Sequence, residues 1–161
     1  MAALSALAIR AAELADAAAI AEAIRAAFEP YRGRLRPTPS ALSETTESIR
    51  ARIGAGQGFV ADAGQRIVGC VMTQLNGPAD LYVGRLAVVP EWQGRGLARR
   101  LMERAEAFAR ARGCTQMSLG VRIALKENIA FFERLSFRLV SEERHPGFTQ
   151  PTYISMRKDL G

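Results

Sequence analysis

Two periods of hydrophobic and polar positions run along this chain, and they separate helical segments from extended ones. Apolar residues recur every three or four positions over residues 16–27, which predicts a helix capped by Asp16. A second helix is expected over residues 42–53. The intervening residues 29–40 are rich in proline and are expected to form a loop.

Short apolar or alternating runs between turn residues predict the strands. These runs cover residues 6–10, 58–62, 66–75, 80–89, 115–121, 137–142 and 152–156. A further helix is expected to follow Gly96 and to end at Gly113, and a short one covers residues 128–135.

The order of these elements constrains the fold. Tight turns join the strands before residue 90, so these neighbours are expected to pair antiparallel. A strand–helix–strand crossover follows, which makes a parallel pair. We therefore predict an α/β fold, with α+β character, in which a central twisted mixed sheet has helices on both faces. One domain is expected to span residues 1–161.

The composition and the distribution of charge bear on whether the protein is globular and where it is located. Of the 161 residues, 48% are hydrophobic and 24% are charged, as in an ordinary globular protein. Charged residues interrupt the alanine-rich residues 1–27, so no run approaches the ~18 apolar residues that span a bilayer. With no export signal recognised, we expect no membrane association and a cytoplasmic location.

Metal chemistry is not expected. Cys70 and Cys114 lie far apart in the sequence, and His145 is the one histidine. A structural zinc site needs four clustered ligands, usually Cys and His. Both cysteines fall in predicted strands, where we expect them to act as small buried hydrophobic residues.

The net charge of +6 comes almost entirely from arginine. Such a balance suits an anionic cofactor, a membrane surface or nucleic acid. The sequence has no zinc-finger, basic heptad or aromatic RNA-binding pattern, so a nucleic-acid-binding protein is a less favoured alternative that only the net charge supports. We interpret the arginines as a solvated surface plus one phosphate-binding cluster.

The most specific chemical signal lies between Val88 and Leu101. A β-branched run stops at Pro90, Gly94-Arg95-Gly96 follows, and an amphipathic helix begins. The first N–H groups of a helix have no intrahelical partner and lie at the positive end of its dipole. This arrangement predicts a site for a phosphate or pyrophosphate.

Gln93-Gly94-Arg95-Gly96-Leu97-Ala98 is similar to the [Arg/Gln]-x-x-Gly-x-[Gly/Ala] signature of the GNAT superfamily of N-acetyltransferases. Residues 84–90 resemble that family's fourth strand and its exit, and residues 128–137 resemble its later helix and turn. The resemblance covers essentially the whole chain. It implies the GNAT acyl-CoA N-acyltransferase fold and direct transfer of an acetyl group from acetyl-CoA to an amine in a ternary complex.

The resemblance also implies a cofactor site. The positions expected to contact acetyl-CoA are Leu86, Ala87, Val88, Gln93, Gly94, Arg95, Gly96, Leu97, Ala98, Arg99, Asn128 and Phe131. The strand at residues 86–88 is expected to splay from its neighbour, and a backbone N–H near Val88 to stabilise the thioester oxyanion. Asn128 is either the family's asparagine near the pantetheine arm or a helix N-cap.

The chain departs from the family pattern at Phe132, where many members carry the tyrosine assigned to protonate the departing thiolate. Either another residue or water donates the proton, or the step is slower, or activity is lost. Tyr82 is our candidate for a catalytic phenol. Ser136 replaces the glycine of the family's Leu-Gly-Phe turn. This turn is expected to survive a strain of about 1 kcal/mol.

The catalytic base and the acceptor pocket are less defined. Glu44, Glu47, Glu127 and His145 are candidate bases, and His145 has the most suitable ordinary pKa. Tyr31, Arg85 and Tyr153 are expected to line the pocket for a small-molecule or peptide amine.

Three further interpretations stay open. The loop at residues 29–43 carries Arg32, Arg34 and Arg36, so an acidic acceptor is conceivable, although a solvated basic loop is favoured. A non-catalytic acyl-CoA sensor is the rival function that Phe132 supports. Edge strands in this fold often pair, so a homodimer is also open.

Overall fold

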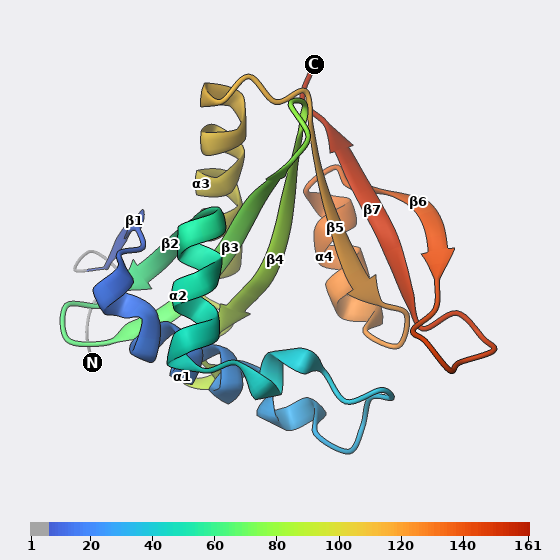
Figure 1. Cartoon of the computed structure of the whole chain (residues 1–161), viewed down its shortest axis with the longest axis horizontal. Coiled ribbons are helices and arrows are strands. Elements are labelled where there is room, and N and C mark those ends of the chain that lie inside the picture. Colours follow the sequence, from blue (N-terminus) through green and yellow to red (C-terminus); the bar gives the residue numbers. More distant parts are fainter. Residues whose placement is uncertain (1–6) are drawn as a thin grey trace.

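Seven strands form one mixed sheet in the order β1-β2-β3-β4-β5-β7-β6 (Figure 1). The computed structural model describes residues 7–161. The strands are β1 (Ala8–Ala11), β2 (Gln57–Asp62), β3 (Ile67–Asn76), β4 (Asp80–Val88), β5 (Gln116–Arg122), β6 (Arg138–Glu143) and β7 (Tyr153–Asp159). The helices are α1 (Ala17–Phe28), α2 (Thr46–Ala55), α3 (Leu97–Ala111) and α4 (Lys126–Arg134), with short 3₁₀ turns at Leu14–Asp16, Glu29–Tyr31, Ser40–Ser43 and Pro90–Trp92.

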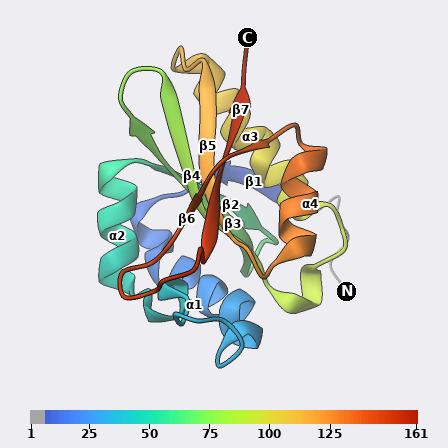
Figure 2. The same cartoon turned by 90° about the vertical axis from the view of Figure 1, so that its right-hand side faces the viewer.

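Helices lie on both faces of the sheet, as predicted. α1 and α2 cover one face, and α3 and α4 cover the other (Figure 2). Ile20 and Ile24 of α1 and Leu97 and Leu101 of α3 are almost completely buried against it. Burying one such side chain contributes roughly 1.5–3 kcal/mol, so these amphipathic stripes hold the three layers together.

Strands β4 and β5 are parallel neighbours, but they pair over a short length. Their register partners are Asp80 with Gln116, Leu81 with Met117 and Tyr82 with Ser118. Ser118 Oγ donates to Asp80 Oδ2 at 2.7 Å and fastens this paired end. Beyond Tyr82 the two strands diverge, which leaves one edge of β4 open (Figure 1).

A β-bulge interrupts β4 beside this opening. Met72 pairs with Gly84 and Cys70 with Ala87, so Arg85 and Leu86 together face a single residue of β3. Arg85 has φ +53, in the left-handed region, which costs an L-residue roughly 1–2 kcal/mol. The bulge therefore needs support from its surroundings.

Glu44 supplies that support from the loop before α2. Its carboxylate is buried and accepts from Arg85 Nε at 2.5 Å, Arg52 Nε at 2.9 Å and Ser48 Oγ at 2.6 Å. Its backbone carbonyl accepts from Arg25 of α1 at 2.6 Å. Burial alone would raise the pKa of Glu44, but the hydrogen bonds from Arg85 and Ser48 outweigh it and hold the pKa below its usual range.

Several local predictions were wrong. The helix expected over residues 42–53 starts later, at Thr46, because Thr45 caps it by accepting from the Ser48 N–H at 3.1 Å. Asp16 stands at the N-cap of α1, but its carboxylate binds Arg10 instead of capping the helix.

Two positions also differ in their elements. Cys114 is buried, but it lies in the turn before β5 rather than in a strand. Helix α4 begins at Lys126 with Leu125 as its N-cap, so Asn128 sits inside the first turn and is not the cap. The start of the first predicted strand, residue 6, lies outside the described residues.

We expect Glu44→Gln to lower the free energy of unfolding by about 3 kcal/mol, because two arginines lose their buried countercharge. The control Glu47→Gln changes an exposed carboxylate one turn away and should stay within about 0.5 kcal/mol of the parent. Urea unfolding near neutral pH measures both variants.

The same pair of proteins tests the pKa of Glu44. A carboxylate whose pKa is lower in the folded protein stabilises it above the unfolded pKa of about 4.3. That stability is lost as the pH falls through the lower folded pKa. The parent's advantage over Glu44→Gln should therefore shrink in acid, and an advantage that grows in acid would contradict the charge network.

Candidate functional site

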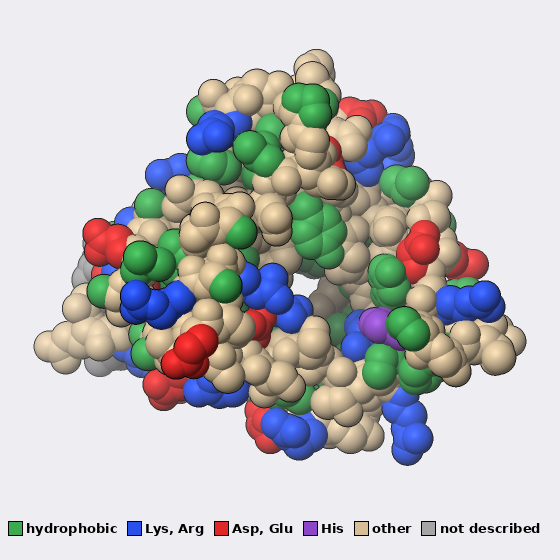
Figure 3. Space-filling view, in the orientation of Figure 1, with side chains coloured by type: hydrophobic (Ala, Val, Ile, Leu, Met, Phe, Trp, Pro, Cys, Tyr) green, Lys and Arg blue, Asp and Glu red, His purple; other side chains and the backbone are tan. Residues whose placement is uncertain are grey.

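A cavity of about 750 Å³ lies where β4 and β5 diverge. Its walls come from the end of α1 and the following loop, β4, the start of α3, the end of β5, α4 and the β6–β7 loop. Basic side chains gather around a hollow on this face of the molecule (Figure 3). Every residue predicted to contact acetyl-CoA or the acceptor lines this cavity except Arg95, whereas the candidate bases Glu44 and Glu47 do not.

One end of the cavity is formed by the glycine loop and α3. Gly94 and Gly96 have φ +78 and +80, conformations that L side chains rarely adopt. Gly96 is the N-cap of the 15-residue α3, and a Cβ at either glycine would have nothing within 4 Å. Gly96, Leu97 and Ala98 also line the cavity, so the first turn of α3 borders it at the end that suits an anion.

The side chains of this loop and of the first turn of α3 have partners within the protein. Gln93 Nε2 donates to the Val88 carbonyl at 2.9 Å, so it braces the loop against β4. Arg95 stacks its guanidinium 4.6 Å from the centre of the Trp92 ring, and it does not line the cavity. Arg99, on the first turn of α3, does line it and makes only an exposed ion pair with Glu103 at 3.8 Å.

The backbone of Val88 is directed into the opening. The Val89 N–H donates to the Val68 carbonyl of β3 at 2.9 Å. Successive N–H groups of a strand point to opposite sides, so the Val88 N–H points the other way from that of Val89. Val88 and its register partner Gly69 are accordingly a non-hydrogen-bonded pair. The Val88 N–H therefore faces away from β3, and the residue lines the cavity.

His145 and Tyr153 form a cluster at the other end. Their rings lie 4.9 Å apart, and His145 Nδ1 is 2.5 Å from Thr152 Oγ1. Burial and then the positive charge of Arg122 lower the pKa of His145 below 6.5. The imidazole is therefore neutral near pH 7, the form that accepts a proton.

The four candidate bases are separated by their positions. Glu44 is held by its arginines, and its lowered pKa makes it a poor base. Glu47 does not line the cavity, whereas Glu127 and His145 do. Geometry thus leaves Glu127 and His145.

The phenols and Phe132 occupy different depths. Tyr82 is 45% exposed and lines the opening, as does Tyr31, which packs edge-on against Phe28. Phe132 is buried, with its ring centre 5.1 Å from that of Phe131, and it reaches the cavity. Ser136 has φ +74, so the turn that follows α4 survives without glycine.

Sequence reasoning missed Arg122, Trp92 and Leu125, which also line the cavity. The alternation of buried residues along β5 places Arg122 on the opposite face from Val121, but the register with β7 was needed to bring it to this site. The arginines at 32, 34 and 36 are exposed and outside the lining, consistent with a solvated loop.

Two searches of residues 7–161 gave negative results. They contain no group of three or more His, Cys, Asp or Glu side chains placed to hold a metal ion. No helix in this part of the chain is long and apolar enough to cross a membrane.

Comparison with known proteins identifies the family of this chain. The family model for the acetyltransferase (GNAT) family matches residues 18–137. An uncharacterized N-acetyltransferase of Chlorobaculum tepidum is 28% identical over 138 residues, which are 86% of this chain and 79% of that protein.

Solved structures share the fold. PaiA N-acetyltransferase from Thermoplasma acidophilum, in complex with coenzyme A, superposes with a TM-score of 0.79 at 18% identity and covers 95% of this chain and 98% of its own. The yncA protein of Salmonella typhimurium, with its cofactor acetyl-CoA, gives a TM-score of 0.73 at 22% identity, covering 96% and 94%. The sheet that splits between β4 and β5, the glycine loop at α3 and the family match agree, and this chain belongs to the acetyltransferase (GNAT) family.

Proposed function

We propose that this protein is an N-acetyltransferase that moves an acetyl group from acetyl-CoA directly to an amine. One observation carries the proposal. A single cavity joins the open N-terminus of α3 and the Val88 N–H at one end to the neutral His145 at the other. A thioester and an amine bound at these two ends would meet without a covalent enzyme intermediate.

The cofactor end suits acetyl-CoA in shape and charge. The pyrophosphate would accept from the first N–H groups of α3, beside Gly94 and Gly96, and Arg99 would add positive charge. The pantetheine amides would pair with the open edge of β4, as a peptide adds to a sheet. Two structures of the same fold were solved with coenzyme A or acetyl-CoA, which supports this ligand.

The chemistry would proceed in three linked events. His145 or Glu127 takes a proton from the ammonium, and the free amine attacks the thioester carbonyl. The Val88 N–H donates to the oxygen as it becomes negative, and such a donor is worth roughly 3–4 kcal/mol. The carbon–sulfur bond then breaks as the nitrogen loses its second proton to solvent, and the thiolate leaves and takes up a proton from Tyr82 or water.

Phe132 cannot protonate the departing thiolate. With a thiol pKa near 8.5, a thiolate is already an acceptable leaving group, so the step does not require a strong acid. Tyr82 is the exposed phenol that lines the opening, and it is our candidate donor. An amine that loses its proton to His145 leaves that proton available for a later transfer through water.

We expect Gly96→Ala to weaken acetyl-CoA binding at least tenfold, because the new methyl group enters the space at the start of α3. The matched control is Gly113→Ala. Gly113 has φ +79, against +80 for Gly96, and equally has nothing near its Cβ position. Both variants should lose about 1 kcal/mol of stability from the same backbone strain.

A thermal-shift titration with acetyl-CoA, with adenosine as the ligand control, measures this difference. Saturation at a hundred times Kd stabilises the folded protein by about 2.7 kcal/mol, which is readily detected. Equal weakening by Gly96→Ala and Gly113→Ala would argue against a phosphate site at this loop. An absence of any shift in the parent at millimolar acetyl-CoA would remove the basis of the proposed function.

We expect His145→Gln to lower kcat/KM for the best amine by roughly 10²- to 10⁴-fold, the usual contribution of a general base. In the parent, kcat/KM should fall as acid protonates His145 below its ordinary pKa of 6.5, and this inflection should be absent in the variant. We would measure the rate by thiol release from acetyl-CoA at each pH, for the parent and the variant.

Glu127→Gln separates the two remaining bases. Loss of activity in this variant, with an unchanged profile in His145→Gln, would assign the base to Glu127 instead. Tight acetyl-CoA binding without thiol release from any amine would favour the rival function, a sensor of acyl-CoA.

A further inference from the structure

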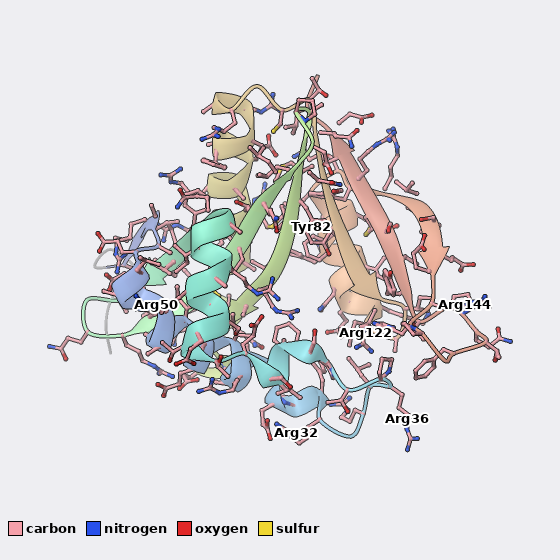
Figure 4. All side chains as sticks on the ribbon, in the orientation of Figure 1. Arg32, Arg36, Arg50, Tyr82, Arg122 and Arg144 are labelled. Carbon is pink, nitrogen blue, oxygen red and sulfur yellow. The ribbon has the colours of Figure 1, made fainter. Side chains whose placement is uncertain are left out.

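Three residues of the acceptor half share one face of the sheet. Arg122 of β5 is the register partner of Tyr153 of β7, and directly paired residues point to the same side. Tyr82 pairs with Ser118, which lies four residues before Arg122 on the same strand and thus on the same face. All three side chains line the cavity, and Figure 4 marks Arg122 at the end of β5.

Arg122 differs from the other three arginines that line the cavity, Arg85, Arg99 and Arg134. Arg99 and Arg134 are exposed. The guanidinium of Arg85 is neutralised by the buried carboxylate of Glu44. Within residues 7–161, Arg122 has no hydrogen bond, ion pair or ring contact, although it is partly buried. Burial lowers the pKa of Arg122, as expected for a charge withdrawn from water without a countercharge.

The surrounding charges leave room for an anion. Glu127 is the one carboxylate among the lining residues, and it is exposed and makes no ion pair with Arg122. The facing elements contribute Arg85, already paired, the exposed Arg134 of α4 and the neutral His145. An anionic group of a ligand would therefore supply the countercharge that Arg122 lacks in the protein.

The distances favour a small ligand. Register partners such as Arg122 and Tyr153 have Cα atoms about 5 Å apart, and the His145 ring lies 4.9 Å from that of Tyr153. Arg122, Tyr153 and His145 thus line the same part of the cavity, and one small molecule would present an amine to His145 and an anion to Arg122. A planar guanidinium binds a carboxylate through two parallel hydrogen bonds.

We infer that the acceptor is a small amine that carries a carboxylate, as an amino acid does, and that Arg122 binds this carboxylate. The inference rests on the proposed acetyl transfer and adds the class of acceptor to it. It does not involve the exposed arginines of residues 29–43, because none of them reaches the cavity.

Matched acceptors test the inference directly. We would compare amino acids with their carboxamides, and an aminoalkyl phosphate with its amino alcohol, by thiol release from acetyl-CoA. The acids should exceed their amides in kcat/KM by roughly ten- to a hundredfold, the usual value of a hydrogen bond to a charged group. Equal kcat/KM values for acid and amide would overturn the inference. A preference for the phosphate alone would show that the anion is not a carboxylate and would overturn that part of it.

Arg122→Met should abolish this preference by raising KM for the acids while it leaves the Kd of acetyl-CoA unchanged. Arg122→Lys keeps the charge without the planar fork, so it should keep part of the preference. Arg144→Met is the matched control, because Arg144 is an exposed arginine beside His145 that does not line the cavity (Figure 4). Loss of the preference in Arg144→Met as well would contradict a specific role of Arg122.

A binding measurement separates this inference from the proposed function. Calorimetry on the protein saturated with coenzyme A would compare N-acetyl amino acids with their carboxamides. If no amine is acetylated, acetyl transfer fails as the function. Selective binding of the carboxylates that Arg122→Met removes would still support the anion site, and equal binding of both would overturn it.

Discussion

Strands β4 and β5 stay paired over only three register positions, and the site is built on their separation. A strand edge without a neighbour exposes backbone N–H and C=O groups, which a protein normally pairs or covers. Here the edge from residue 83 to residue 88 borders the cavity instead. The fold thus keeps a row of hydrogen-bonding groups available to a ligand, and the paired end, fastened by Asp80 and Ser118, keeps the opening fixed.

The bulged conformation of β4 is stabilised by contacts with the layer that contains α1 and α2. Arg85 stands in the left-handed region, and its guanidinium is fixed by Glu44 and by Ser40 Oγ at 2.9 Å. Glu44 also binds Arg52 of α2, and its carbonyl binds Arg25 of α1. A buried carboxylate needs its donors in place to be stable. The network therefore couples the position of the segment before α2, which holds Ser40 and Glu44, to that of β4.

The two ends of the cavity use positive charge in different ways. At α3 the charge is spread over backbone N–H groups and the exposed Arg99, which suits a multiply charged phosphate. At the end of β5 it is concentrated on the partly buried Arg122, which suits a single small anion. Burial, and after it this same charge, lowers the pKa of His145 and keeps its ring neutral. Under our proposals Arg122 therefore both attracts the acceptor and helps to prepare the base.

The sequence by itself determined the features that depend on local chemistry. Alternation and helical spacing predicted the strands and helices, and the two glycines at 94 and 96 predicted a turn with positive φ before α3. The order of the elements, with tight turns before residue 90 and one strand–helix–strand crossover after it, predicted the mixed sheet. An error arose where a side chain had an alternative partner, because Asp16 binds Arg10 instead of capping α1.

Only the tertiary structure decided which distant residues meet. The acceptor half combines a residue from the end of β5, one from the start of β7 and one from the loop between β6 and β7. Their proximity depends on strand register and on the angle at which the sheet opens, and neither follows from local spacing. Arg122 could therefore not be recognised as a site residue from the sequence, where it is one arginine among many. It became distinct because the fold partly buries it in the cavity wall without a countercharge.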